Sequence, residues 1–422
     1  MIKLVGFEFK KILLHRSLLI VLLLFTLLDV WKIQDQWKSQ SYFADSPGWA
    51  AAYWELYPTY AGAITPEKQE DLDALCNPIF DKVKDWTFNR AINPNSLTKI
   101  NDFSDYLFLS RFYVSPWTRF SNYAEDATRV CQAAAENVQL YHGTGNTAEV
   151  EKNAKIYLLF QNRSITEFCY TERDERMASY TFSQYLVLLL CIYLWILCIE
   201  REKESKMDEM LHTMSYGGVP TVQSKIFVSA SMTAFISLWF FLTDQIAFRA
   251  IYSWCKSGNM PLYSLVDFTY TPLNITLKSY TVLSGLLRIQ ALLFLMCVLY
   301  CAAAILKNAL ALFLVLLGGS EFLLWGSQAL ASCSNPWMKI LNPCSFLTCY
   351  PLFRTCEFVV LGGKPFLAYQ IAFWVQLLGT LTLLLVLLFT AGKQNFLLSH
   401  RNGRQKIGPK KSGKDKQVCH EK

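Results

Sequence analysis

Ionisable side chains inside long apolar runs are the residues of this chain with the clearest chemical potential. Asp244, Arg249 and Arg288 fall toward the outer ends of two such runs. Asp29 lies late in another run, and Glu321 lies within a fourth. A charge inside a membrane usually pairs with another charge or faces a cavity. We favour a structural pair between Asp244 and Arg249 or Arg288 over a polar vestibule on a substrate path. Glu321 has no evident partner in the sequence, so it is the better candidate for a functional group.

Catalytic and metal-binding patterns are missing from the apolar runs. None of the histidines lies in such a run, and the HExxH pattern is absent. The tail segment 408–414 matches the phosphate-binding pattern GxxxxGK, but Asp415 stands where Ser or Thr would hold magnesium, and no strand precedes the segment. We therefore expect that the chain is not an enzyme and binds no metal and no cofactor of its own.

The elements that must position these charges are predicted to be six membrane-spanning helices. Hydrophobic residues make up 53% of the chain, charged residues make up 17%, and the mean hydropathy is +0.22. One span needs about 20 apolar residues. We predict an all-α polytopic membrane protein with a large, mainly helical extracellular segment between the first and second spans. Apolar runs of suitable length cover residues 17–31, 180–199, 226–248, 280–306, 308–333 and 365–392.

The distribution of basic residues predicts the orientation of the chain. Lys and Arg are enriched in short cytoplasmic loops, and here they place both termini in the cytoplasm. An apolar stripe before the first span indicates a helix along the inner leaflet or, equally well, an extension of that span. The predicted parts are an inner-leaflet amphipathic helix at 1–16, a first span at 17–34, an extracellular domain at 35–178, a five-span domain at 179–392 and a basic cytoplasmic tail at 393–422.

Two segments outside the spans have an expected structure of their own. The extracellular domain begins with many aromatic residues, and its second half has a helical composition that is broken at 142–146. The broken outer segment 334–364 contains an uncharged stretch, interrupted by Pro343 and Pro351, that is too short to cross a membrane. We expect a re-entrant or surface-lying pair of short helices there. The outer cysteines allow disulfides, whose connectivity cannot be read from the sequence.

A charged segment at 200–214, which reads EREKESKMDEMLHTM, links the second and third predicted spans. Its apolar residues recur at i, i+3, i+4 and i+7 and therefore form one stripe on a helix. A methionine-rich stripe is adaptable and suits a groove on a partner protein, although such a helix can also lie on lipid headgroups. The stripe consists of Met207, Met210, Leu211 and Met214.

This region resembles the membrane subunit of type-2 ATP-binding-cassette (ABC) exporters. In that family an E-R-E stretch follows the second span, then a set similar to E-L-L-x-T-x-P, and then a lysine that opens the third span. The departures here, a methionine for the usual leucine and a missing proline, are mild. The N-terminal helix, the six spans and the broken segment before the last span are also similar. The matching residues are Glu200, Arg201, Glu202, Glu209, Met210, Leu211, Thr213 and Lys225.

The resemblance implies a permease that forms a pathway with a second permease subunit, of the same or a homologous sequence, in the lipid bilayer. Separate cytoplasmic ABC ATPases, which bind ATP and magnesium, would dock on the 200–214 coupling helix. We expect a multi-pass protein of a bacterial plasma membrane that exports a peptide, an antimicrobial or another amphipathic compound and has no nucleic-acid partner. The alternative is a non-transporting sensor or immunity protein that binds its ligand through 35–178.

Overall fold

Helices dominate the computed structural model, which describes residues 2–13, 16–45, 48–92, 100–204, 219–253, 255–306 and 308–405. Within these residues, six helical stretches are long and apolar enough to cross a membrane. This finding confirms the prediction of an all-α, multi-pass membrane protein. The six stretches lie in α2 (Arg16–Gln40), α9 (Phe182–Glu204), α11 (Val219–Ile251), α12 (Leu277–Ile305), α13 (Ala309–Ala329) and α17 (Ala368–Gln405).

Helix α9 is the central helix of the bundle. In its apolar stretch 61% of the residues are buried, against 22% in each of α2, α13 and α17. Leu190, Cys191 and Leu194 of α9 are completely buried, and the indole of Trp195 donates a hydrogen bond of 2.8 Å to Thr233 of α11. The outer helices keep broad apolar faces exposed, as expected for surfaces that meet lipid or another subunit.

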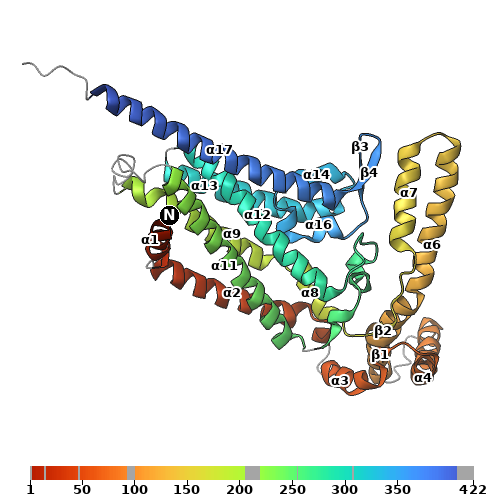
Figure 1. Ribbon diagram of the computed structural model, residues 1–422. Coiled ribbons are helices and arrows are strands. Elements are labelled where there is room, and N and C mark those ends of the chain that lie inside the picture. The colour runs from red at the N-terminus through yellow and green to blue at the C-terminus, as the bar shows by residue number, and fades with distance from the viewer. Residues whose placement is uncertain are drawn as a thin grey trace, which may run out of the picture.

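The N-terminal helix α1 (Ile2–Leu13) is an element separate from α2, and Figure 1 shows the two helices at an angle to one another. Ile12 is buried, and Val5 and Phe9 pack against the same core. Glu8 is also buried, with its carboxylate 3.6 Å from the amine of Lys11. The apolar stripe therefore faces the protein, and α1 is not a continuation of the first span.

The segment between α2 and α9 lies at the end of the bundle opposite to α1 and to the C-terminal end of α17 (Figure 1). It is mainly helical, as predicted. The expected break is present, since Gly145 has φ of 73° and the side chain of Asn146 accepts a hydrogen bond from the amide of Glu149. The helices are α3 (Trp49–Tyr60), α4 (Pro66–Ile92), α5 (Ile100–Leu109), α6 (Ser115–Gly143), α7 (Thr147–Phe160) and α8 (Glu172–Ser179).

The broken outer segment is more elaborate than the expected pair of helices. Three short helices precede a β-hairpin, and the second and third of these helices are buried in protein: Phe346, Leu347 and Phe353 are each at most 3% exposed. Lys339 is also buried and forms an ion pair with Glu357. The elements are α14 (Pro336–Leu341), α15 (Ser345–Thr348), α16 (Tyr350–Phe353), β3 (Phe358–Leu361) and β4 (Lys364–Leu367).

Several helices extend beyond their apolar runs. Helix α2 continues to Gln40 and α17 continues to Gln405, because a polar residue ends a hydrophobic run without ending the helix.

Residues 406–422, with the GxxxxGK match, lie outside the described part. No disulfide is present among the described cysteines. The remaining elements are η1 (Tyr42–Asp45), β1 (Gly62–Ala63), the π-helical η2 (Ser110–Val114), β2 (Glu167–Phe168), η3 (Ser257–Asn259), η4 (Leu262–Ser264), η5 (Val266–Phe268) and η6 (Leu330–Ser332); β1 pairs with β2.

Candidate functional site

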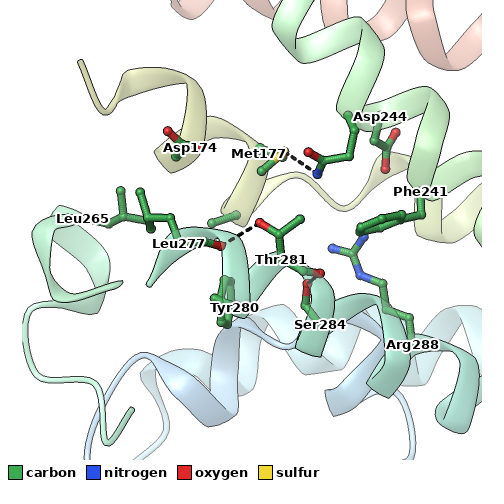
Figure 2. Close-up of a pocket in the computed structure, with 12 residues that line it drawn as sticks. Asp174, Met177, Phe241, Asp244, Leu265, Leu277, Tyr280, Thr281, Ser284 and Arg288 are labelled. Carbon is green, nitrogen blue, oxygen red and sulfur yellow. Dashed lines mark hydrogen bonds between the residues drawn. The ribbon is translucent and has the colours of Figure 1, made fainter. Parts of the chain in front are cut away.

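A polar hollow between α11 and α12, beside α8, is the strongest candidate site in the described part of the chain. It has an outer groove of about 610 Å³ and an inner cavity of about 30 Å³, which share part of their lining. We call the two together the funnel, and Figure 2 shows its inner cavity. The shared lining residues are Asp174, Met177, Phe241, Gln245, Leu277 and Thr281.

A helix cap, a close glycine contact and a side-chain hydrogen bond position the helices that form the walls of the funnel. Thr276 caps the start of α12, since its side chain accepts a hydrogen bond from the amide of Ser279. A Cβ at position 285 would lie only 3.2 Å from the ring of Phe241, so Gly285 lets this ring of α11 press against α12. On the α8 side, the amide of Gln245 donates to the sulfur of Met177 at 3.0 Å (Figure 2).

The outer groove has an apolar wall and a cationic rim. Leu242 and Val282 are 49% and 55% exposed. Arg249, Lys256 and Lys278 are exposed at the same groove, and none of the three forms an ion pair within the described residues. This combination fits a molecule that is apolar along its length and negatively charged at its head.

A buried ion pair forms the side of the funnel next to α8. The guanidinium of Arg173 donates to the carboxylate of Asp174 at 3.1 and 3.2 Å, to the hydroxyl of Ser257 at 2.6 Å and to the backbone carbonyls of Ser253 and Cys255 at 3.1 and 3.0 Å. Ser257 in turn donates to Asp174. Every buried side-chain polar atom of Arg173, Asp174 and Ser257 has a partner. We call these three residues the closed cluster.

The inner end of the funnel is formed by Asp244 and Arg288. Asp244 of α11 is 4% exposed, and one of its oxygens accepts a hydrogen bond of 2.8 Å from Ser183 of α9. Arg288 extends from α12 toward Phe241 and Asp244 (Figure 2). The described structure has no ion pair between Asp244 and Arg288, and the Nε of Arg288 has no hydrogen-bond partner. The two charges therefore face each other across the inner cavity.

A second acid, Asp29 of α2, interacts with Asp244. The side chain of Asp29 is completely buried, and Tyr180 donates a hydrogen bond of 2.7 Å to one of its oxygens. The carboxyl groups of Asp29 and Asp244 interact with each other. The described residues show no ion pair of Asp244 with Arg249 or Arg288, and we call Asp29 and Asp244 the acid pair, which the sequence alone did not indicate.

The other predicted site residues lie apart from the funnel. Glu321 is half-buried on α13, near Tyr185 of α9 and Cys344, and has no hydrogen bond or ion pair within the described residues. The backbones of Glu200, Arg201 and Glu202 continue α9. The rest of the predicted coupling helix, 205–214, lies outside the described residues, and with it Met207, Met210, Leu211 and Met214.

The charged run at 172–176, which reads ERDER, was overlooked in the sequence. Besides the closed cluster, it supplies Glu172, which accepts hydrogen bonds of 2.7 Å from the amide of Tyr42 and 2.8 Å from the hydroxyl of Tyr170. Arg176 donates to the carbonyl of Gln40 at 2.6 Å. The run therefore ties the end of α2 to α8. Five charges directly before an apolar run are the signal that could have revealed it.

No protein-family model, curated protein or solved structure matches this chain.

Proposed function

We propose that this chain is the permease subunit of an ABC exporter, which pairs with a second permease and is driven by separate ATPases docked on 200–214. The observation that carries the proposal is the funnel, a polar hollow within a bundle of six candidate spans that ends at the buried Asp244 and the half-buried Arg288. Ligand pathways through membranes are places where buried charges face a cavity. The sequence resemblance at 200–225 supports the ATPase as the source of energy.

The connections of the coupling segment support a mechanical link to the funnel. Residues 200–214 lie between α9 and α11 along the chain. Helix α9 holds Asp244 through Ser183, and α11 carries both Asp244 and Phe241. A force on the segment would therefore act on the two helices that set the inner end of the funnel. Movement of α11 against α12 would widen or narrow the cavity.

The lining of the outer groove supports an amphipathic substrate. Leu242 and Val282 offer apolar contact, while Arg249, Lys256 and Lys278 offer positive charge at the rim. A peptide or antimicrobial compound with an apolar body and an anionic group matches both features. Exposed cations of this kind attract such a molecule from solution or from the outer half of a membrane.

The proposal is tested by purifying the tagged full-length chain from its native membranes in a mild detergent and identifying the proteins that come with it. We expect a stoichiometric soluble ATPase, which is lost when Met210→Asp and Leu211→Asp are combined. The matched control exchanges the two residues, Met210→Leu with Leu211→Met, and keeps the stripe apolar, so the ATPase should remain. A chain that purifies without an ATPase in the wild type would overturn the exporter assignment.

A membrane sensor or immunity protein is the second candidate, and one observation favours it. The helical hairpin α6–α7 and the aromatic-rich helix α3 form a large body at one end of the bundle, which a minimal permease does not need (Figure 1). Aromatic rings pack closely in this body, where Tyr53 contacts the rings of Phe43, Phe112 and Tyr170. An intact chain that binds a ligand through this body, without an ATPase partner, would support this alternative.

A further inference from the structure

The acid pair between α2 and α11 leaves two buried oxygens without a donor. Asp29 Oδ2 and Asp244 Oδ1 have no hydrogen-bond donor in the protein, although the other oxygen of each carboxyl group accepts a hydrogen bond. The two carboxyl groups interact with each other. Ionised carboxylates only accept hydrogen bonds, so two of them in contact would leave both oxygens unsatisfied and would repel.

One proton resolves both difficulties. A protonated carboxyl group donates a strong, charge-assisted hydrogen bond to the neighbouring carboxylate. Two carboxyl groups in contact at a buried site share a single proton for this reason, as in the aspartic proteases. Because Asp29 is 0% exposed and Asp244 is 4% exposed, water cannot screen the repulsion that a second negative charge would create.

The charged and titratable groups around the pair agree with one proton. Tyr180, which follows α8, and Ser183 of α9 act as neutral donors. From α12, Arg288 contributes one positive charge across the inner cavity. Tyr252, directly after α11, lies near Tyr180, and Asp174 at the other side of the cavity is neutralised by Arg173. A singly protonated pair therefore gives a site that is neutral together with Arg288, whereas a fully ionised pair leaves one negative charge uncompensated.

We propose that Asp29 and Asp244 form a proton-binding site, in which one proton is held between the two carboxyl groups and exchanges with water through the funnel. Asp244 lines the inner cavity, whose shared lining continues into the outer groove, so a path for the proton is present. Loss of the proton places two like charges between α2 and α11 and pushes these helices apart. The site thus links the packing of the first and third spans to the pH at the mouth of the funnel, and this inference does not depend on the exporter assignment.

Infrared difference spectroscopy of the purified full-length chain in lipid nanodiscs tests the proposal, because protonated carboxyl groups have a C=O band that carboxylates lack. We expect the wild type to show this band at neutral pH and to lose a component of it in Asp29→Asn and in Asp244→Asn. Glu321→Gln is the matched control, since Glu321 is half-buried in α13 away from the pair and its variant should keep the component. A component that survives both Asn variants would overturn the proposal.

The pH dependence of unfolding gives a second measurement that needs no spectroscopic assignment. The folded pair holds a proton that separated aspartates in the unfolded chain release at neutral pH, so the proton stabilises the fold at low pH and the stabilisation is lost as the pH rises. We expect the unfolding temperature of the wild type and of Glu321→Gln to fall as the pH rises from about 4, where unfolded aspartates ionise, to the pH at which the folded pair ionises. The Asn variants should lack that loss, because an amide donates to the remaining carboxylate at every pH. The proposal would be contradicted if the unfolding temperature changed equally with pH in the wild type, Glu321→Gln, Asp29→Asn and Asp244→Asn. If the Asn variants fail to fold, the absence of the protonated-carboxyl band from Glu321→Gln at neutral pH would also contradict it.

Discussion

The two acid-containing clusters on the walls of the funnel differ in how completely they are bonded. In the closed cluster, Asp174 is matched by Arg173 and Ser257. In the acid pair, Asp244 meets Asp29, and the arginine nearest to it, Arg288, stays on the far side of the cavity. Both clusters are buried, and one acid of each, Asp174 or Asp244, lines the inner cavity. They differ in hydrogen bonding and in net charge.

This difference distinguishes a cluster that only stabilises the fold from one that can bind and release a proton. A buried ion pair whose every donor and acceptor is satisfied has one arrangement and resists change. A buried pair with unmatched oxygens has at least two arrangements, with and without its proton, and these differ in how they pack. The closed cluster therefore fixes α8 against the loop after α11, while the acid pair can change the distance between α2 and α11.

The largest expected effect is the loss of the closed cluster. Arg173→Ala leaves Asp174 buried without its cation and removes the donors to two carbonyl groups. Breaking a buried ion pair from one side costs about 3–5 kcal/mol. We expect a loss of that size in the free energy of unfolding of the detergent-solubilised chain. The control is Arg173→Ala with Asp174→Ala, which removes the stranded charge and should recover part of the loss. A single variant as stable as the wild type would show that the cluster is not structural.

The second effect concerns the cation that faces the acid pair. Arg288→Gln removes the positive charge across the cavity, so the pair should hold its proton more firmly. We expect the pH at which the stability loss ends to lie about one unit or more higher than in the wild type, because a charge has been removed from a site of low dielectric. Arg249→Gln, at the exposed rim, is the control and should leave this upper limit in place. An upper limit unchanged by Arg288→Gln would mean that Arg288 does not act on the pair.

A smaller effect is expected when the acid pair itself is neutralised. Asp244→Asn keeps the size of the side chain, and its amide can donate to Asp29 as the proton does. The loss in the free energy of unfolding at neutral pH should stay at about 1 kcal/mol, the net value of one hydrogen bond. Asp244→Leu, which can neither donate nor accept, should lose clearly more. If Asp244→Asn is as damaging as Arg173→Ala, the distinction between the two clusters fails.

The sequence predicted the elements better than the contacts between them. Six apolar runs, the break at 142–146 and the discontinuity at Pro343 depend on local composition, and the structure confirms them. The ends of α2 and α17 were underestimated, because a hydropathy pattern records where lipid begins and a helix ends only where its hydrogen bonds end.

Local sequence patterns do not predict the interaction of Asp244 with Asp29. Asp29 lies two spans earlier in the chain, and two acids are the least obvious pair, since opposite charges are the usual expectation inside a membrane. Lys339 gives a similar case, because it lies between two apolar runs but is buried against Glu357 and contributes no charge to the surface. In both cases the fold decided which charges meet, while composition could only show that they were present.

The smallest effect on stability, and the sharpest contrast with the closed cluster, is expected at the rim. Replacing Arg249, Lys256 and Lys278 together by Gln removes exposed charges, which individually change stability by about 0.5 kcal/mol or less. The same change should weaken binding of an anionic single-chain phospholipid several-fold, with little effect on a zwitterionic lipid of equal chain length. The binding should also decline with rising salt in the wild type and lose this dependence in the variant.

The control for the rim lies on α6, where Arg129 is exposed but forms ion pairs with Glu125 and Asp126 far from the groove. Arg129→Gln should leave both lipids bound as in the wild type. Binding of the anionic lipid that survives the triple change would exclude the rim as its site and would leave the apolar wall as the source of affinity. A loss of binding without a loss of stability would instead show that this edge of the funnel serves recognition, in contrast to Arg173, whose charge is already satisfied inside the protein.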